Sequence, residues 1–365
     1  MRSLTSTLLA AQRSASATPF VRVQVRDARA GVTRLAWTRL YTGAEPDYYH
    51  GATIPGDGSL VRARVGADDY RLYRQRAPAP GPGSDFGTWT VVADVSSQSG
   101  TALASQGSQV LLFSVDQTQR TIRVRESTDY GATFGSPVWV VNTDSPIRWL
   151  AAAMKSDGAA LLLYSTTSPA AVWGVKKVGQ GWGMPFVWLY TFSDVTGLAC
   201  LHTGDWSIVV AGVDASSNAK LWGVILGDGV AYPAGEWSPP KTIVQASAGS
   251  GVTFRAPFLA AGSPLRLAFV EAYSGQAPYS RPALSHTVPG TSFEQNMWRE
   301  PGPFNLASSY GMALAVTSSH AWLSTPAGVW RASLTVPPLD LTVDVLDLRL
   351  TAEPFGGTLR VALRN

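Results

Sequence analysis

A unit of roughly fifty residues recurs along the chain of 365 residues. Each unit opens with a short run of small and apolar residues: TALAS from 101, LAAAM from 150, GLACL from 197, PFLAA from 257 and GMALAV from 311. A second apolar run follows in each unit, as VLLF, LLLY, SIVVAG, LRLAFV and AWLST, and a third run comes after it. Short apolar runs at this period predict the strands of β-propeller blades. Such small sheets are stable only when they stack around an axis, because one sheet cannot bury both of its faces alone.

The repeat also indicates where the propeller begins and ends. An earlier copy within residues 60–92 contains LVRARV, YRLYRQR and GTWTVV, and the last unit has only three runs before residue 334. The missing strand of that last unit can come from PFVRVQV (19–25) or from LAWTRL (35–40). We therefore predict an all-β fold with a six-bladed propeller over residues 58–335, and seven blades as the alternative.

Composition excludes several classes of function. Hydrophobic residues make up 45% of the chain and charged residues 15%, which supports a sizeable core and argues against disorder. The formal net charge of +4 includes no long basic run, so we expect no nucleic-acid partner. The single cysteine, Cys200, permits no intrachain disulfide and is predicted to be a buried core residue. The four histidines show no metal-ligand spacing and no nucleotide-binding fingerprint occurs, so we expect neither a metal nor a cofactor.

The N-terminal stretch does not have the features of an export signal. Its apolar run is only LLAA, shorter than the ~7 residues of a signal-peptide core. No stretch reaches the ~18 consecutive apolar residues of a membrane helix. We therefore expect no signal peptide and no membrane span, and we predict a short helical arm within residues 1–18.

The turn after the third run of the second blade carries a distinctive pattern. Its residues, within ESTDYGATF (126–134), are Thr128, Asp129, Gly131, Thr133 and Phe134. The pattern resembles the Asp box, S/T-x-D-x-G-x-T/S-aromatic, of sialidase-type propellers and related families, and SDFGTW (84–89) and GQGW (179–182) resemble shortened copies. In such a turn Asp accepts backbone N–H groups, Gly permits a positive φ, and the aromatic ring fills the gap to the next strand. We interpret Asp129 as structural, with a ligand or catalytic carboxylate as the alternative.

Both ends of the chain alternate between apolar and polar residues outside the propeller. The C-terminal segment alternates in LTVDVLDLRL, turns at Phe355-Gly356-Gly357 and alternates again in TLRVALRN, which predicts a β-hairpin over residues 336–365. The N-terminal VRVQVRD, within a β segment over residues 19–57, has the same character. We predict that it pairs with the C-terminal segment, so that the propeller is inserted into a second, hub-like β domain that continues beyond Asn365.

This organisation resembles proteins of tailed-phage tail tips and baseplates. The resemblance rests on VRVQVRD, on residues 39–65 and on LRVALRN. It implies a structural or adhesion component of a virion tail, assembled in the host cytoplasm, whose propeller is a decoration or recognises the host surface. It further implies other tail or baseplate subunits as partners, a homo-oligomer (a trimer or hexamer) and a cell-surface glycan as ligand. A stand-alone carbohydrate-binding propeller is an alternative.

The resemblance to sialidase-type propellers raises an enzymatic alternative. FRAP (254–257) matches the F/Y-R-x-P tetrapeptide of that family, but it occurs in the fifth unit instead of the first. Arg255, Glu271 and Tyr273 would then be the catalytic residues of a glycan-processing enzyme, whereas a strand-edge ion pair is the other interpretation of Arg255. The full catalytic set of the family is missing, and we predict that the protein is not an enzyme.

Three further groups of residues are candidates for binding or catalysis. Trp182, Trp206 and Trp222 can stack on sugar faces if exposed, although packing between blades is the preferred interpretation. EPDYYH (45–50) combines two carboxylates with a histidine and can support acid–base chemistry, but a solvated turn is preferred. The arginines of two strands can meet an acidic polysaccharide or subunit, or simply be solvated. They are Arg62, Arg64, Arg71, Arg74 and Arg76.

Overall fold

The regular elements of the molecule are all β-strands. The computed structural model describes residues 21–24, 37–42, 47–66, 68–78, 80–95, 100–179, 181–188, 192–226, 240–260, 266–273, 280–287, 297–301, 313–317, 319–325, 328–333 and 340–343. Every element in these ranges is a strand, which confirms the all-β prediction. None of the residues in them forms a helix that could span a membrane. The predicted helical arm lies outside these ranges.

Six sheets of four or five strands make up the main body of the described chain, and we number them along the sequence. Sheet 1 contains β3 (Asp47–Thr53), β4 (Leu60–Gly66), β5 (Arg71–Ala77) and β6 (Thr90–Asp94). Sheet 2 contains β7 (Ala102–Gln106), β8 (Gln109–Val115), β9 (Thr121–Ser127) and β10 (Val138–Asn142). Sheet 3 contains β11 (Ile147–Met154), β12 (Ala160–Thr167) and β13 (Ala170–Val178), with β14 (Gly181–Trp182) and β15 (Phe186–Trp188) both paired to β13.

The later sheets repeat this antiparallel order. Sheet 4 contains β16 (Phe192–His202), β17 (Trp206–Asp214), β18 (Ala219–Leu226) and β19 (Lys241–Ala246). Sheet 5 contains β20 (Val252–Ala260), β21 (Arg266–Tyr273), β22 (Ser280–Thr287) and β23 (Met297–Pro301). Sheet 6 contains β24 (Ala313–Val316), β25 (His320–Thr325), β26 (Gly328–Ser333) and, from the other end of the chain, β2 (Trp37–Thr42).

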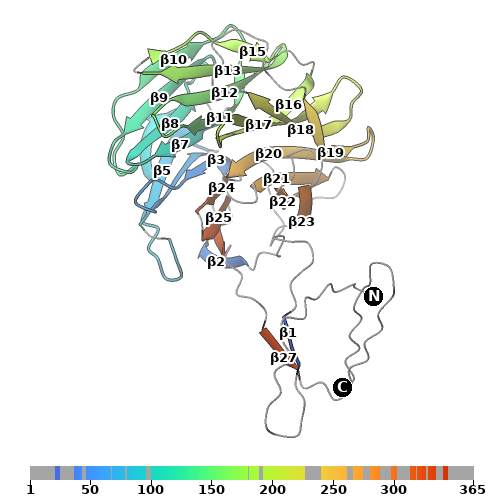
Figure 1. Ribbon diagram of the computed structural model, residues 1–365. Coiled ribbons are helices and arrows are strands. Elements are labelled where there is room, and N and C mark those ends of the chain that lie inside the picture. Colours follow the sequence, from blue (N-terminus) through green and yellow to red (C-terminus); the bar gives the residue numbers. More distant parts are fainter. Residues whose placement is uncertain are drawn as a thin grey trace, which may run out of the picture.

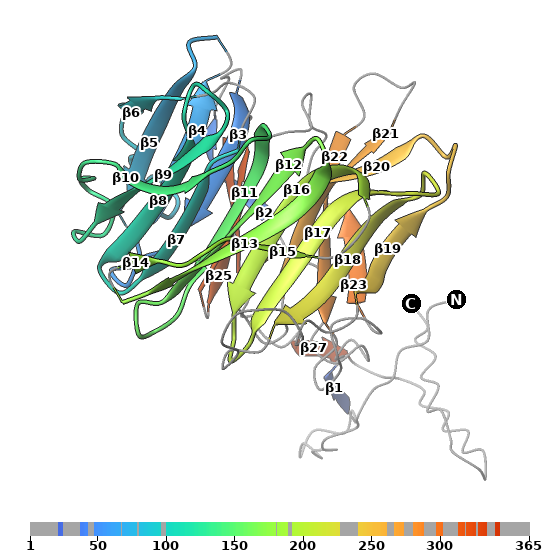
Figure 2. The ribbon, with the colours of Figure 1, turned by 90° about the horizontal axis from the view of Figure 1, so that it is seen from above.

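The sheets stand side by side around a central axis, as a β-propeller (Figures 1 and 2). The first strand of each sheet is the innermost one, and these strands contact one another in the order β3, β7, β11, β16, β20, β24 and back to β3. Five of the six coincide with the small, apolar first runs found in the sequence. Small side chains occur there because the innermost strands approach one another most closely.

The second strand of each sheet is apolar on both of its faces because both faces are covered by neighbouring sheets. In β8, Leu112 belongs to a buried cluster with Val61 of sheet 1, whereas Phe113 belongs to another with Leu162 of sheet 3. Continuous runs such as VLLF and LLLY are therefore required by the packing. The core of the propeller consists of these layers between sheets.

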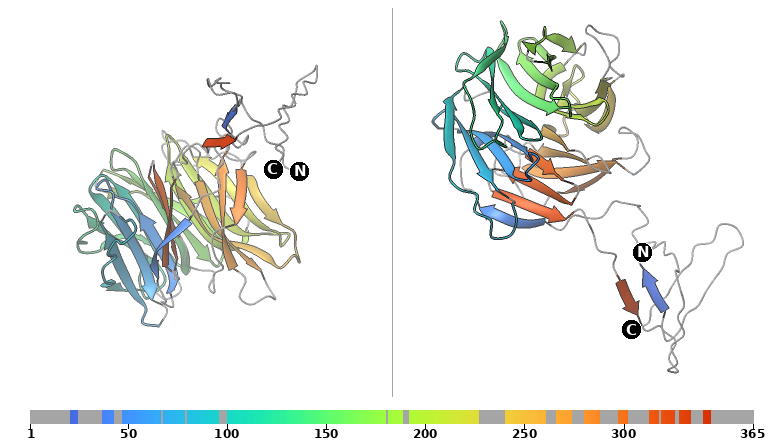
Figure 3. Two further views of the ribbon diagram at one scale, coloured as in Figure 1. Left: turned by 90° about the horizontal axis from the view of Figure 1, so that it is seen from below. Right: turned by 60° about the vertical axis from the view of Figure 1, so that its left-hand side comes forward.

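The ring is closed by β2, which lies before sheet 1 in the sequence but pairs with β26 of sheet 6. Of the two candidate segments, LAWTRL is therefore the source of the missing strand. The other candidate segment contributes β1 (Val21–Gln24), which pairs with β27 (Asp340–Val343) in a separate two-stranded sheet drawn outside the ring in Figure 3. The predicted pairing of VRVQVRD with the C-terminal segment is thus observed for β1 and β27. The predicted turn at Phe355 to Gly357 lies outside the described residues.

Two sequence boundaries are corrected by these pairings. The sequence predicts an N-terminal β segment over residues 19–57 before a propeller starting at 58, yet β2 and β3 within that segment are strands of sheets 6 and 1. The preferred interpretation of residues 45–50 as a solvated turn is also wrong for residues 47–50, which begin β3. This strand was not predicted from the sequence because it contains an aspartate and a histidine and no apolar run. Its partner β4 is more apolar.

We expect Gly328→Ala to weaken the closure of the ring. Gly328 has a φ of 142° and faces Thr42 at the end of β2, where an added Cβ would overlap the carbonyl oxygen of Tyr41. Backbone strain and displacement of β2 should together cost about 2–4 kcal/mol of the free energy of unfolding. Urea unfolding measures this loss. Gly181→Ala is the control, because a Cβ at that position meets no atom, and equal stability of the two variants would contradict the closing role of this contact.

Candidate functional site

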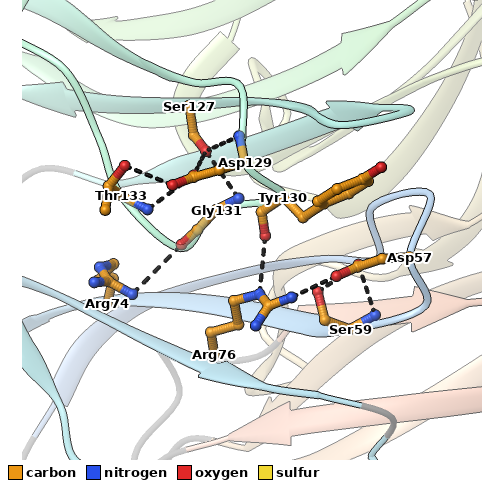
Figure 4. Close-up of polar contacts among 9 residues, drawn as sticks. All are labelled: Asp57, Ser59, Arg74, Arg76, Ser127, Asp129, Tyr130, Gly131 and Thr133. Carbon is orange, nitrogen blue, oxygen red and sulfur yellow. Dashed lines mark hydrogen bonds and ion pairs between the residues drawn. The ribbon is translucent and has the colours of Figure 1, made fainter.

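The connection between β9 and β10 forms a compact turn built around Asp129, and we call residues 127–135 the Asp129 turn (Figure 4). The side-chain hydroxyl of Ser127 donates to Asp129 Oδ1 at 2.7 Å and accepts the N–H of Gly131 at 2.8 Å. Thr133 donates its N–H to Asp129 Oδ1 at 2.9 Å and its hydroxyl to Oδ2 at 2.6 Å. Both oxygens of the carboxylate are therefore occupied within the turn.

These hydrogen bonds also set the charge state of Asp129. The hydroxyl and N–H of Thr133, followed by the hydroxyl of Ser127, lower the pKa of Asp129 from its ordinary 3.8 to about 2. The carboxyl group is thus ionised throughout the neutral range, since all these donors stabilise the anion. A general acid needs a proton to donate. The geometry therefore supports the structural interpretation of Asp129 over the catalytic one.

The Asp129 turn is held against the neighbouring sheet by two arginines of β5. Arg74 donates to the carbonyl of Gly131 at 3.4 Å, and Arg76 donates to the carbonyl of Tyr130 at 3.2 Å. Arg76 also forms an ion pair with Asp57, which accepts the N–H and hydroxyl of Ser59. Figure 4 shows these side chains of sheet 1 reaching towards the turn of sheet 2. The turn is therefore a joint between sheets 1 and 2.

Gly131 is required in this joint for two reasons. Its φ is 77°, a conformation that residues with a Cβ rarely adopt. In addition, an added Cβ would lie 2.8 Å from a methyl group of Val61 in β4. The prediction of a positive φ at Gly131 is confirmed, and the close approach to sheet 1 is what the sequence did not show.

The first position of the motif was assigned to the wrong residue. The sequence interpretation placed Thr128 there, but Thr128 is exposed and Ser127 makes the hydrogen bonds. Phe134, at the last position, packs on the buried cluster shared with sheet 1. In the copies, Gly87 and Gly179 likewise have positive φ, and the aromatic ring that follows packs on a neighbouring side chain.

A second feature lies on the outer part of the same gap between sheets 1 and 2. Trp139 of β10 is 62% exposed and stands directly opposite Arg123 of β9. Arg125 shares the face of Arg123, because side chains two apart on a strand point the same way. Neither the tryptophan nor these arginines were singled out from the sequence. The signal available was a strand, IRVRES, with two arginines of the same parity beside a tryptophan in SPVWVV.

Within the described part of the chain, the centre of the ring has two small cavities without charged side chains. The innermost strands enclose cavities of about 50 and 190 Å³. The described residues lining them carry no charge, and Leu103, Cys200 and Leu259 line both. The thiol of Cys200 is buried, and burial raises its pKa. The prediction of Cys200 as a core residue is confirmed.

The three tryptophans predicted as candidate glycan contacts are mainly packing residues. Trp206 and Trp222 are buried in the core of sheet 4, where Trp222 meets Phe192 edge to face. The preferred interpretation as packing residues is therefore confirmed for these two, and a glycan contact by them is wrong. Trp182 is half-buried, with its ring centroid 5.5 Å from that of Phe113 in sheet 2. It fills a gap between blades in the same way as Phe134.

The arginine-rich strands β4 and β5 do not form one solvated face. Arg62 and Arg64 are buried, and both guanidinium groups lie over the ring of Trp89, at 4.8 and 4.6 Å from its centroid. Arg74 and Arg76 lie on the opposite face, since their cross-strand partners on β4 are Ala63 and Val61. Arg71, at the start of β5, is largely exposed and pairs with Asp94. Grouping Arg71 with Arg74 and Arg76 was wrong, and the sequence could not show that both faces of the sheet are covered.

The residues of the enzymatic alternative are not gathered on one face of their sheet. Arg255 of β20 pairs with Val270 of β21, whereas Glu271 pairs with Phe254. Arg255 and Glu271 therefore point to opposite faces, and Glu271 is buried. The backbone of Tyr273 follows in β21, but its side chain lies outside the described part. Nor does the described part contain a group of three His, Cys, Asp or Glu side chains able to hold a metal ion.

Comparisons with known proteins establish the fold and nothing finer. No protein-family model matches the chain, and no curated protein matches its sequence. A protein of unknown function from Dyadobacter fermentans is similar with a TM-score of 0.57 and 12% identity, over 83% of this chain and 99% of that chain. A Penicillium chrysogenum α-L-arabinanase complexed with arabinobiose is similar with a TM-score of 0.53 and 14% identity, over 83% of this chain and 98% of that chain. SapL1 lectin in complex with α-methyl fucoside is similar with a TM-score of 0.51 and 14% identity, over 78% of this chain and 90% of that chain.

We expect Asp129→Asn to destabilise the propeller at neutral pH. The amide keeps one accepting oxygen for the N–H of Thr133 but removes the negative charge that the donors of the turn stabilise, so about 0.5–1.5 kcal/mol of unfolding free energy should be lost. The contribution of Asp129 is fully present above the ordinary carboxyl pKa, because the folded pKa is the lower one, and it declines between about pH 4 and pH 2. Urea unfolding at pH 7, 5 and 3 should therefore show a gap between wild type and variant that narrows at pH 3. The control is Asp144→Asn at an exposed position, and a gap independent of pH would contradict this account of the charge.

Proposed function

We propose that the protein is a glycan-binding propeller, and that it binds through the surface around Trp139. The single observation that carries this proposal is the exposure of Trp139, 62%, on the outermost strand of sheet 2. Trp139 is the most exposed of the aromatic side chains described, and the preceding Val138 is 58% exposed on the other face of the strand. An exposed indole supplies a flat apolar platform for the C–H face of a sugar ring.

The surroundings of Trp139 supply the polar groups that a sugar also needs. Arg123 lies opposite on β9, and its side chain is 51% exposed. Asn142, at the end of the same strand as Trp139, is exposed too. A platform with a few hydrogen-bonding groups beside it is the usual composition of a site that binds small polar ligands. The two sugar-bound propellers named above support this function by analogy of fold alone.

We also propose that the six sheets are six blades, the sixth being closed by β2. The ring of contacts among the innermost strands supports this count.

The binding proposal predicts a selective effect of Trp139→Ala. We expect loss of glycan binding by about tenfold or more, since stacking on a tryptophan contributes on the order of 1–3 kcal/mol in comparable ring contacts. A glycan array followed by calorimetric titration of the strongest ligand measures it. Met184→Ala is the control, because Met184 is also a highly exposed apolar residue, in the segment joining β14 and β15 of sheet 3. Unchanged binding by Trp139→Ala, or an equal loss in both variants, would refute the proposed site.

We further propose that the protein is a structural and adhesion component of a phage tail tip or baseplate. The observation that favours it is the pairing of β1 with β27, which makes the propeller an insertion between two strands of another sheet. A two-stranded sheet is at best marginally stable in water. Other tail subunits, or copies of this chain in a trimer or hexamer, would supply further strands. The propeller would then carry the glycan-binding surface to the host cell.

This assembly role predicts that β1 and glycan binding are separable. Val23 pairs with Leu341, and Val23→Pro removes a backbone N–H from β1. We expect the variant to keep its glycan affinity but to lose its oligomeric mass in sedimentation and its place on tails in electron micrographs. Val23→Thr, which retains the N–H, is the control. Normal assembly by Val23→Pro would rule out the role of β1.

A further inference from the structure

The face of sheet 2 that looks towards sheet 1 carries an unusual concentration of arginine. In β9, Ile122 and Val124 point to the buried cluster shared with sheet 3, so Arg123 and Arg125 point the other way. The cross-strand partner of Arg125 is Leu112, which packs in the cluster containing Val61 of sheet 1. Both arginines therefore border the gap between sheets 1 and 2.

Sheet 1 adds two more cations across the same gap. Arg74 and Arg76 lie on the face of Ala63 and Val61, which look towards sheet 2. These two are already engaged, because Arg76 pairs with Asp57 and both donate to carbonyls of the Asp129 turn. Burial lowers the pKa of Arg74, and the nearby charge of Asp129 partly opposes this effect. The charges of sheet 1 are thus largely balanced locally.

The positive charges of Arg123 and Arg125 are compensated much less well by neighbouring carboxylates. Arg123 approaches Asp116 only to 3.9 Å, at a largely exposed position where such a pair is weak. Arg125 donates to the carbonyl of Gly135 at 3.4 Å, and it forms no ion pair with any of the described carboxylates. Burial, followed by the charge of Arg123, lowers the pKa of Arg125. Two neighbouring guanidinium groups of this kind are stabilised by an anion placed between them.

We propose that Arg123 and Arg125, together with Trp139, form a subsite for the anionic group of an acidic glycan. The inference rests on the proposed glycan binding at Trp139 and specifies the class of its ligand. Residues two apart on a strand are about 7 Å apart, so one carboxylate or sulfate can accept hydrogen bonds from both arginines. The attached sugar ring then lies beside β10, where Trp139 stands opposite Arg123.

The test compares three polymers of different charge. Polygalacturonate carries carboxylates, dextran sulfate carries sulfates, and dextran is neutral; each is titrated against the full chain at low and at physiological salt. We expect an anionic polymer to bind about tenfold or more tightly than dextran, with affinity that falls as salt rises. Arg125→Gln should remove most of that preference and leave the weak binding of dextran unchanged, whereas Arg123→Gln, which also removes a polar group beside Trp139, should weaken the binding of all three polymers and the anionic ones most. The anionic polymer that binds more tightly identifies the preferred anion, carboxylate or sulfate.

Two controls separate this subsite from general attraction between opposite charges. Arg120→Gln removes the same charge from an exposed position on the same hairpin, and it should change the affinity little. Arg125→Lys keeps the charge, so it should retain part of the preference for anionic polymers. Thermal unfolding of Arg125→Gln checks that this variant folds normally. An equal loss in Arg120→Gln, or no preference for either anion, overturns the acidic-glycan subsite while glycan binding at Trp139 stands. Absence of any binding that depends on Trp139 overturns the proposed function itself.

Discussion

The pairing of β2 with β26 is the contact on which the rest of the propeller depends. Each sheet has two apolar faces and is stable only with a neighbour on both sides. Sheet 6 provides this for sheets 5 and 1, and its outermost strand comes from residues 37–42, ahead of sheet 1 in the chain. Packing of Tyr41 on Phe86, at 5.2 Å between ring centroids, reinforces the junction. So does the hydrogen bond from the Trp322 indole to the carbonyl of Pro80, at 3.2 Å.

In addition to this apolar packing, polar contacts fix the position of each sheet relative to its neighbour. Hydrophobic contact holds neighbouring sheets together without fixing how they slide past each other, because it is not directional. The Asp129 turn fixes sheet 2 on sheet 1 through carbonyls that meet Arg74 and Arg76. Further along the ring, Lys177 of sheet 3 pairs with Glu126 of sheet 2 at 2.7 Å. The hydroxyl of Thr196 in sheet 4 donates to the carbonyl of Phe254 in sheet 5 at 2.6 Å.

One gap between sheets thus contains both a structural and a proposed binding region. In the Asp129 turn, Ser127 and Thr133 donate to the carboxylate oxygens, and the facing arginines donate to backbone carbonyls, which suits a rigid support. On the same gap, Arg123, Arg125 and Trp139 have polar and aromatic groups that the propeller itself does not use fully. A binding surface placed directly on a rigid joint loses little conformational freedom when a ligand arrives. The proposed insertion between β1 and β27 would present that surface as a single module.

The sequence by itself determined the all-β class, the repeat and the strand order, because the stacking of sheets requires apolar runs at fixed spacing. It also indicated the burial of Cys200, the turn at Gly131 and two candidate strands for closing the ring, between which the structure decided. Only the tertiary structure decided which residues face a neighbour and which face water. Trp206, Trp222 and Trp139 are the same residue type in similar strands, yet two are buried and one is exposed. Likewise Arg255 and Glu271 are close in sequence but lie on opposite faces, and Ser127 rather than Thr128 points into its turn. Strand periodicity predicts which face of its sheet a side chain lies on. The exposure of that side chain depends on the neighbouring sheet, whose position is set by contacts between residues far apart in the chain.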